Sequence, residues 1–159
     1  DQTEALTFAD KVVVMYDGRV VQMGTPEELF ETPAHTFVGY FIGSPGMNLF
    51  PAEVAGHRAR LAGGTVDLGA DYGTPKGRVQ VGIRPEYCQL TDAPGLPATI
   101  RRVEDVGRHR LIRAEAAGQP VSIVLPEGVA LETGQTNLAF APGKVNVYAD
   151  DWRITGGAA

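Results

Sequence analysis

The chain has 159 residues, of which 43% are hydrophobic and 21% are charged, and its formal net charge is −5. This composition is that of an ordinary soluble globular protein with one or two small domains. It includes no stretch near the roughly 18 apolar residues that span a membrane, and the first ten residues lack the features of a secretory signal. The single cysteine, Cys88, excludes an internal disulfide and a cysteine-based zinc site, which suits a reducing cytoplasm.

The acidic excess lies at one end of the chain. Residues 1–45 contain seven Asp or Glu against two Lys or Arg, whereas residues 46–159 contain twelve of each. The segment 43–46, Gly-Ser-Pro-Gly, consists of residues that break helices and strands, and it stands at this step in charge. We therefore expect a domain boundary at residue 45.

Residues 1–24 predict a helix followed by a hairpin. Asp1 and Glu4 have the spacing of a capping box, and apolar residues follow at helical intervals. Two apolar runs, 12–16 and 19–23, then flank Asp17-Gly18, a dipeptide that is typical of tight hairpin turns.

Two short helices are expected next. The segment 25–28, Thr-Pro-Glu-Glu, combines an N-cap Thr, a Pro at the first helical position and a Glu at the third. Thr32-Pro33 repeats part of this pattern and predicts a second helix that continues to Ile42 and is capped by Gly43. His35 would lie at the start of that helix.

From Phe50 onward the hydrophobic pattern has a period of two and is interrupted by Gly and Pro, which indicates β-structure. The fold class is therefore mainly β, with a small closed or partly closed barrel over 46–159 preceded by an α/β segment over 1–45. The expected strands are 51–56, 57–62, 65–68, 78–84, 97–104, 109–116, 119–125, 136–141 and 144–149.

Three segments resemble the ATP-hydrolysing subunits of maltose-type ABC importers. Gly24 to Asn48 is similar to the segment before their C-terminal domain, and the opening Asp1 to Ala5 is similar to the residues that follow their switch histidine. The segment Gly82, Ile83, Arg84, Pro85 and Glu86 matches a marker of their TOBE domain, a transport-associated OB fold. The resemblance implies that 1–45 is the C-terminal tail of a nucleotide-binding domain and that 46–159 is an OB-like TOBE domain.

The residues themselves lack the chemistry of an ATPase. A phosphate-binding G-x-x-x-x-G-K-[ST] loop is absent, because the one Gly-Lys pair, Gly143-Lys144, is followed by Val145. The switch histidine of the family would precede Asp1, and the strand-like run that ends at Asp17 is interpreted as the hairpin above. We therefore expect no catalytic residue, no bound cofactor and no metal site in this chain, with ATP and Mg²⁺ bound by the parent subunit.

Several other residues have both a structural and a functional interpretation. Arg84 and Glu86 flank Pro85 and can form an ion pair or backbone hydrogen bonds that fix a turn, or they can contact a ligand. Cys88 is expected to be a small buried side chain without reactivity. Tyr87 differs from many relatives, which have His after the Arg-Pro-Glu, and the resemblance assigns it no role.

Five arginines lie within thirteen residues, a density that could recognise an anion. The segment has no aromatic residue for base stacking and its domain is neutral, so nucleic acid is not expected as a partner. A solvated strand face or a protein interface remains the favoured interpretation. The candidate interaction surface consists of Arg101, Arg102, Arg108, Arg110 and Arg113.

By resemblance, the parent subunit hydrolyses ATP to import a sugar, a polyol or a glycerol-phosphate-like solute, and this part would hold two ATPase subunits together and bind regulators. The expected partners are a second copy, the transmembrane permease subunits and a regulatory protein, at the cytoplasmic face of the membrane. An alternative is a ligand-sensing OB domain that binds a small anion or a sugar directly. Residues 1–45 would normally pack on a catalytic core, so we expect them to expose apolar surface.

Overall fold

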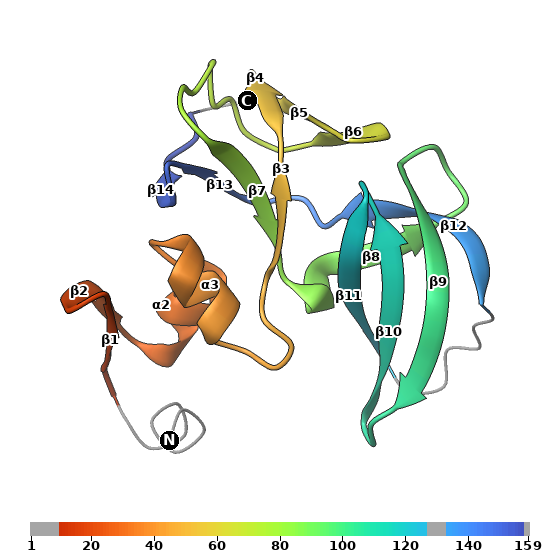
Figure 1. The fold of residues 1–159 in the computed structure, drawn as a ribbon, viewed down its shortest axis with the longest axis horizontal. Coiled ribbons are helices and arrows are strands. Elements are labelled where there is room, and N and C mark those ends of the chain that lie inside the picture. The colour runs from red at the N-terminus through yellow and green to blue at the C-terminus, as the bar shows by residue number, and fades with distance from the viewer. Residues whose placement is uncertain (1–9, 127–132, 158–159) are drawn as a thin grey trace.

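A computed structural model describes residues 10–126 and 133–157 of the chain. Figure 1 shows a hairpin and two short helices, followed by a β-rich remainder. The elements are β1 (Val12–Tyr16), β2 (Arg19–Gly24), α2 (Pro26–Glu31), α3 (Thr36–Phe41), β3 (Asn48–Pro51), β4 (Glu53–Ala55), β5 (Arg58–Leu61), β6 (Gly64–Asp67), β7 (Val79–Ile83), the 3₁₀ helix η1 (Pro85–Tyr87), β8 (Cys88–Thr91), β9 (Leu96–Asp105), β10 (His109–Ala116), β11 (Gln119–Pro126), β12 (Gly134–Phe140), β13 (Asn146–Ala149) and β14 (Trp152–Ile154).

The predicted hairpin is confirmed. Strands β1 and β2 pair in antiparallel register, and the turn residues Asp17 and Gly18 both have positive φ angles, of 52° and 74°. Positive φ at both central positions is the requirement of a type I′ turn, which an Asp-Gly dipeptide meets at little steric cost. The helix expected before this hairpin falls mainly on residues 1–9, which lie outside the described residues.

Helix α2 is confirmed at its predicted start. Thr25 accepts a hydrogen bond from the Glu28 amide, and the Glu28 carboxylate accepts one from the Thr25 amide, which completes a capping box. The backbone hydrogen bond from Thr25 lowers the pKa of Glu28 below its ordinary value.

The predicted start of the second helix is wrong. Thr32 is the C-cap of α2, with its hydroxyl bonded to the Glu28 carbonyl, so it cannot also cap a following helix. Helix α3 begins at Thr36 instead, with His35 as its N-cap. It ends at Phe41 with Ile42 as its C-cap, and Gly43 follows with a φ of +104°.

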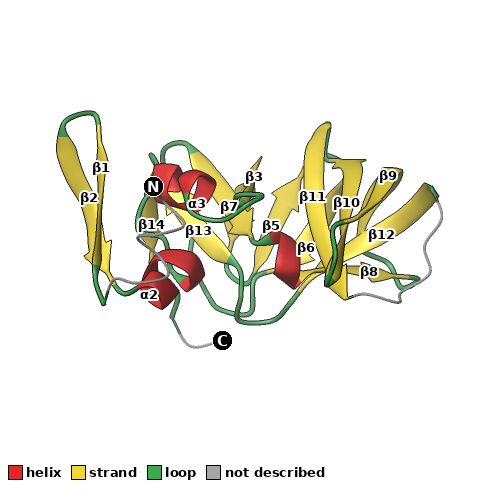
Figure 2. Ribbon diagram, turned by 90° about the horizontal axis from the view of Figure 1, so that it is seen from below, coloured by secondary structure: helices red, strands yellow, loops and turns green. Residues whose placement is uncertain are grey.

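The described strands form several antiparallel sheets, and the expected partly closed barrel corresponds to the half-barrel of the five-stranded sheet. Their orders are β11-β10-β9-β12-β8, β14-β13-β7-β3, β4-β5-β6 and the β1-β2 hairpin. The mainly β fold is confirmed, and the five-stranded sheet curves as a half-barrel. Figure 2 shows this sheet at one end of an elongated molecule and the hairpin at the other, with the helices α2 and α3 between them.

Some strand predictions were wrong in detail. The expected strand 51–56 is divided at Ala52, because β3 pairs with β7 whereas β4 pairs with β5. Strands β8 and β14 lie where no strand was expected. Both are short and lie at the edge of a sheet, where β8 pairs with β12 and β14 pairs with β13. The other expected strands match observed strands with shifts of a few residues at their ends.

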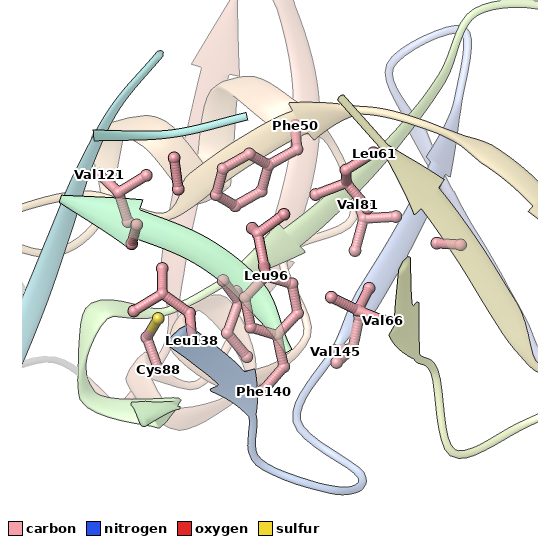
Figure 3. Packing of buried hydrophobic residues seen from close by; sticks show 14 of the residues in the cluster. Phe50, Leu61, Val66, Val81, Cys88, Leu96, Val121, Leu138, Phe140 and Val145 are labelled. Carbon is pink, nitrogen blue, oxygen red and sulfur yellow. The ribbon is translucent and has the colours of Figure 1, made fainter. Parts of the chain in front are cut away.

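One apolar core joins the sheets of residues 48–154. Figure 3 shows side chains from β3, β7, β9, β11 and β12 meeting in this core, among them Phe50, Val81, Leu96, Val121 and Leu138. A second, smaller cluster comprises Val14, Leu29, Val38 and Ile42 and joins the hairpin to the two helices. The hairpin therefore packs on α2 and α3 through this second cluster.

The outer edge of β11 is covered in part by the segment that enters β3. The Asn48 side chain donates to the Ser122 carbonyl at 2.8 Å and accepts from the Ser122 amide at 2.9 Å. Pro120 and Pro126 stand near the two ends of the same strand. Asn48 thus replaces, at one residue, the hydrogen bonds of a neighbouring strand.

Within residues 10–126 and 133–157, the helices are too short and too polar to cross a bilayer.

Candidate functional site

The marker segment 82–86 lies where β7 passes into η1, beside the two helices. Gly82 is packed so closely that an added Cβ would lie 2.4 Å from the Met47 sulfur, so a larger residue would force the Met47 side chain to move. Ile83 and Pro85 are buried, whereas Glu86 is exposed. Arg84, which lies between Ile83 and Pro85, is therefore placed inside the protein.

The Arg84 side chain is 1% exposed and donates to backbone carbonyls of both helices. Its Nε donates to Phe30 at 2.9 Å, Nη1 donates to Gly39 at 2.9 Å and to Ile42, and Nη2 donates to Leu29 at 3.3 Å. The guanidinium also lies over the Phe30 ring, 4.4 Å from its centroid. These carbonyls belong to the last turns of α2 and α3.

The electrostatics of this arrangement follow from the helix ends. The final carbonyls of a helix have no partner within the helix and carry partial negative charge, which suits a cation. Arg84 thereby serves as a shared C-terminal cap for α2 and α3. Burial lowers the pKa of Arg84, because desolvation disfavours its charged form. The sequence left two structural roles open for Arg84, an ion pair or backbone hydrogen bonds. The structure shows backbone hydrogen bonds, and the acceptor residues lie 42 to 55 residues earlier in the chain.

Polar side chains of β13 extend the same contact. The Tyr148 hydroxyl donates to the Pro33 carbonyl at 2.8 Å, and the Asn146 amide donates to the Glu31 carbonyl at 3.0 Å. Tyr148 is fully buried, and burial raises the pKa of its hydroxyl. Sequence reasoning missed both residues; the signal was a polar or aromatic side chain inside a short strand that is otherwise apolar.

The chain after α2 also pairs with β14. The Arg153 amide donates to the Ala34 carbonyl at 2.9 Å, and the Thr36 amide donates to the Asp151 carbonyl at the same distance. Residues 34–36 therefore act as a short extra strand beside β14. Arg84, Tyr148, Asn146 and this strand-like contact together form what we call the helix-docking site.

Tyr87 takes part in the rim of this site. Its hydroxyl donates to the Glu31 carboxylate, which also lies 3.2 Å from the Lys144 ammonium. The hydrogen bond to Glu31 raises the pKa of Tyr87, and the same carboxylate raises the pKa of Lys144. Gly143-Lys144 thus belongs to a surface turn that contacts α2.

The candidate arginine surface lies on the β9-β10 hairpin, and three of its members are paired with acids of the same sheet. Arg101 lies 3.3 Å from Glu115. Arg102 and Arg113, which face each other across the strands, share Glu104 at 2.7 and 3.5 Å. These guanidinium groups are already paired with carboxylates, so direct anion recognition by the three arginines is not favoured.

Arg108 and Arg110 differ from the other three. Arg108 is exposed in the turn after β9, and the described part of the chain offers it no ion-pair partner. The Nε of Arg110 is buried and lacks a hydrogen-bond acceptor among the described residues. Among the described residues, the arginines of this surface without an ion-pair partner therefore lie at the tip of the hairpin.

The remaining candidates are structural in their surroundings. Cys88 is 1% exposed within the main core, and burial raises the pKa of its thiol to about 12. His35, His57 and His109 lie on different elements, and the described residues contain no group of three His, Cys, Asp or Glu side chains placed to hold a metal ion.

Comparisons with known proteins agree with this architecture. Residues 43–88 match the family described as the MalK OB fold domain, and residues 81–147 match the TOBE domain. The two matches overlap at β7 and the marker segment, where the helix-docking site is built.

Curated relatives match almost the whole chain. It is 39% identical over 151 residues to the sn-glycerol-3-phosphate import ATP-binding protein UgpC of Jannaschia sp. (strain CCS1), which covers 95% of this chain and 43% of that protein. It is 44% identical over 140 residues to UgpC 2 of Agrobacterium fabrum, covering 85% of this chain and 38% of the relative. An uncharacterized ABC transporter ATP-binding protein, y4oS of Sinorhizobium fredii, is similar to the same degree. The chain thus spans less than half the length of these relatives.

Proposed function

Because this chain belongs to the family of ABC importer ATP-binding subunits that carry MalK-type OB and TOBE domains, we propose that it is the accessory, non-catalytic C-terminal part of such a subunit. The parent would bind ATP and Mg²⁺ and couple hydrolysis to the import of a solute. That solute would be sn-glycerol-3-phosphate, which appears in the names of several relatives, or a related polyol or sugar. It would lie at the cytoplasmic face of the membrane, bound to permease subunits.

The observation that supports this role is the helix-docking site. Helices α2 and α3 follow the hairpin, and Arg84 fixes the ends of both helices to the β-rich part. A displacement of the hairpin would therefore be transmitted to the sheets instead of being absorbed by a flexible linker. Such a rigid attachment suits a module that holds or regulates an ATPase.

Charge and composition place the domain boundary near residue 45. We propose that the part that folds cooperatively with the β-rich sheets begins earlier, at Thr25. Residues 31–36 and the helix ends bond directly to β13, β14 and Arg84. A chain of residues 25–159 should therefore unfold cooperatively, whereas a chain of residues 46–159 should lose stability. Equal unfolding midpoints for the two truncated chains would contradict this division.

The interaction surface of the module is proposed to be the tip of the β9-β10 hairpin, with Arg108 and Arg110 as its charged residues. Their partner would be a second subunit or a regulatory protein, and not nucleic acid. Arg101, Arg102 and Arg113 are paired with acids of the same sheet, so their charge is largely neutralised. They would contact the partner mainly through van der Waals packing.

The test uses the full-length subunit with Arg108→Glu and Arg110→Glu together. We expect unchanged ATP affinity, with subunit association or the response to a regulator altered in a manner that weakens as salt increases. A matched control is Arg58→Glu, at an exposed site on β5. Normal association and regulation together with lost ATP affinity would contradict the proposal.

A further inference from the structure

Residues 32–36 join α2 to α3, and they are bonded to the β1-β2 hairpin on one side and to strands β13 and β14 on the other. Pro33, His35 and Thr36 are buried, and the backbone of His35 is extended. Four consecutive carbonyls, those of residues 32–35, each accept a hydrogen bond. The segment is therefore fixed along its length, and we call residues 32–36 the relay segment.

Gln22 of β2 holds the relay segment from the hairpin side. Its Nε2 donates to the Thr32 carbonyl at 3.2 Å, and its Oε1 accepts from the Ala34 amide at 2.8 Å. One side-chain amide thus bonds a carbonyl and an amide two residues apart, as the backbone of a neighbouring strand would. The Tyr16 ring of β1 adds an aromatic contact, 5.4 Å from the His35 ring between centroids. The hairpin therefore contacts the segment through both of its strands.

The β-rich part holds the same segment through β13 and β14. The Tyr148 hydroxyl donates to the Pro33 carbonyl at 2.8 Å, and the Arg153 amide donates to the Ala34 carbonyl at 2.9 Å. The amide and the hydroxyl of Thr36 both bond to the turn between these strands, each at 2.9 Å. Ala34 is therefore bonded to both parts at once, through its amide to the hairpin and through its carbonyl to β14.

These bonds constrain the hairpin more strictly than its apolar contacts do. The smaller apolar cluster joins the hairpin to α2 and α3, but apolar contact is not directional and tolerates sliding. A hydrogen bond is sensitive to both distance and angle. A shift of β2 would therefore either break the bonds of Gln22 or move Thr32 and Ala34 with it.

We propose that Gln22 is a positioning residue and that the relay segment transmits displacements of the hairpin to β13 and β14. Energetic coupling between distant parts of a protein is carried by chains of packed and hydrogen-bonded groups, and this chain runs from Gln22 through Ala34 to Arg153. In a complete ATPase subunit, a setting that rests on the proposed function, the relay segment would let a displacement of the hairpin change the position of the β-rich module.

The first test removes the contact on the hairpin side with Gln22→Met, which keeps an unbranched side chain of similar length and removes the amide. We expect the protection of the Ala34 amide from hydrogen exchange to fall on the order of 10-fold, from the usual worth of two neutral hydrogen bonds. The emission of Trp152, the only tryptophan of the chain, should change as well, because its ring lies 4.7 Å from the His35 ring between centroids. Gln89→Met, at an exposed site on β8, is the matched control and should change neither.

The second test adds Tyr148→Phe, which removes the hydroxyl that bonds Pro33 from the β-rich side. If the segment moves as one unit, Tyr148→Phe should lower the protection of the Ala34 amide in the unsubstituted chain and have at least about threefold less effect in the Gln22→Met chain. Thr36→Val, which removes a hydroxyl bond to the β13-β14 turn, takes the place of Tyr148→Phe if that variant does not fold.

Two results would overturn the proposal. One is that the effects of the two substitutions on the Ala34 amide simply multiply, and the other is that Gln22→Met leaves the emission of Trp152 unchanged. Because both measurements use this chain alone, their outcome is independent of the role of a parent subunit.

Discussion

Replacing Arg84 with methionine is the most direct test of the helix-docking site. Methionine keeps an unbranched side chain in the buried position but removes the guanidinium that holds the carbonyls of Leu29, Phe30, Gly39 and Ile42. The ends of α2 and α3 would then lose their shared cap. Lysine at the same position offers three donors from one nitrogen, so it can replace only part of this set.

The expected magnitude comes from the number and kind of bonds. A hydrogen bond to a charged group contributes about 1.5–3 kcal/mol, so four of them would exceed about 6 kcal/mol if they were independent. Desolvation of the buried guanidinium opposes that sum, and water can reach some of the freed carbonyls at the helix ends. We therefore expect Arg84→Met to lower the free energy of unfolding by about 3–5 kcal/mol, and Arg84→Lys by about half as much.

The assay is urea unfolding at neutral pH, with hydrogen exchange of the α2 and α3 amides as a local readout. A loss of about 4 kcal/mol would shift the midpoint by about 2 M at a urea dependence of about 2 kcal/mol per M. Arg58→Met is the matched control, because Arg58 is exposed on β5 and should change stability by less than about 0.5 kcal/mol. If Arg84→Met is within about 1 kcal/mol of the unsubstituted chain, Arg84 does not hold the helices.

Three further predictions concern other parts of the molecule. Glu104→Gln should cost less than about 1 kcal/mol in urea unfolding, with a smaller cost at high salt, because it frees two exposed arginines that face each other; a salt-independent loss would contradict this. The Cys88 thiol should resist thiol reagents in the native state. An unfolded thiol has a pKa near 8.5, whereas burial raises the pKa of Cys88 to about 12, so the free energy of unfolding should fall as pH rises between these values. The expected loss is about 2 kcal/mol at pH 10, and Cys88→Ala should remove it. Met23→Lys should leave the unfolding midpoint unchanged and reduce self-association in sedimentation experiments, because the Met23 side chain is 61% exposed on an apolar hairpin face; unchanged association would show that this face is not adhesive.

The sequence-based predictions succeeded where the determining interactions are local. The hairpin follows from Asp17-Gly18, and the start of α2 follows from Thr25 and Glu28, which bond to each other within one turn. The second helix failed because Thr32 has two possible local roles. Thr32 can cap the end of α2 or the start of a following helix, and in the structure it caps α2. Which of the two roles it takes depends on the pairing of residues 34–36 with β14, more than one hundred residues later in the chain.

The candidate sites show the same limit. The marker segment could be identified by resemblance, but nothing near Arg84 in sequence indicates that its four acceptors lie on α2 and α3. The arginine surface could be identified by density, whereas its neutralisation depends on a cross-strand register that brings Glu104 beside Arg113. The division of 46–159 into separate sheets likewise arises from which strands pair, and the period-two pattern is the same in either arrangement.

The contact between Asn48 and Ser122 has a consequence for how this protein avoids aggregation. The Ser122 amide points away from β10, and the alternation of a strand gives the same outward direction to positions 120, 124 and 126. Two of these positions are prolines, which have no amide hydrogen, and Asn48 already occupies the amide at 122. Among the outward amides of β11, this leaves Val124 as the remaining donor at this edge of the five-stranded sheet. The β11 edge is therefore a poor template for intermolecular strand addition.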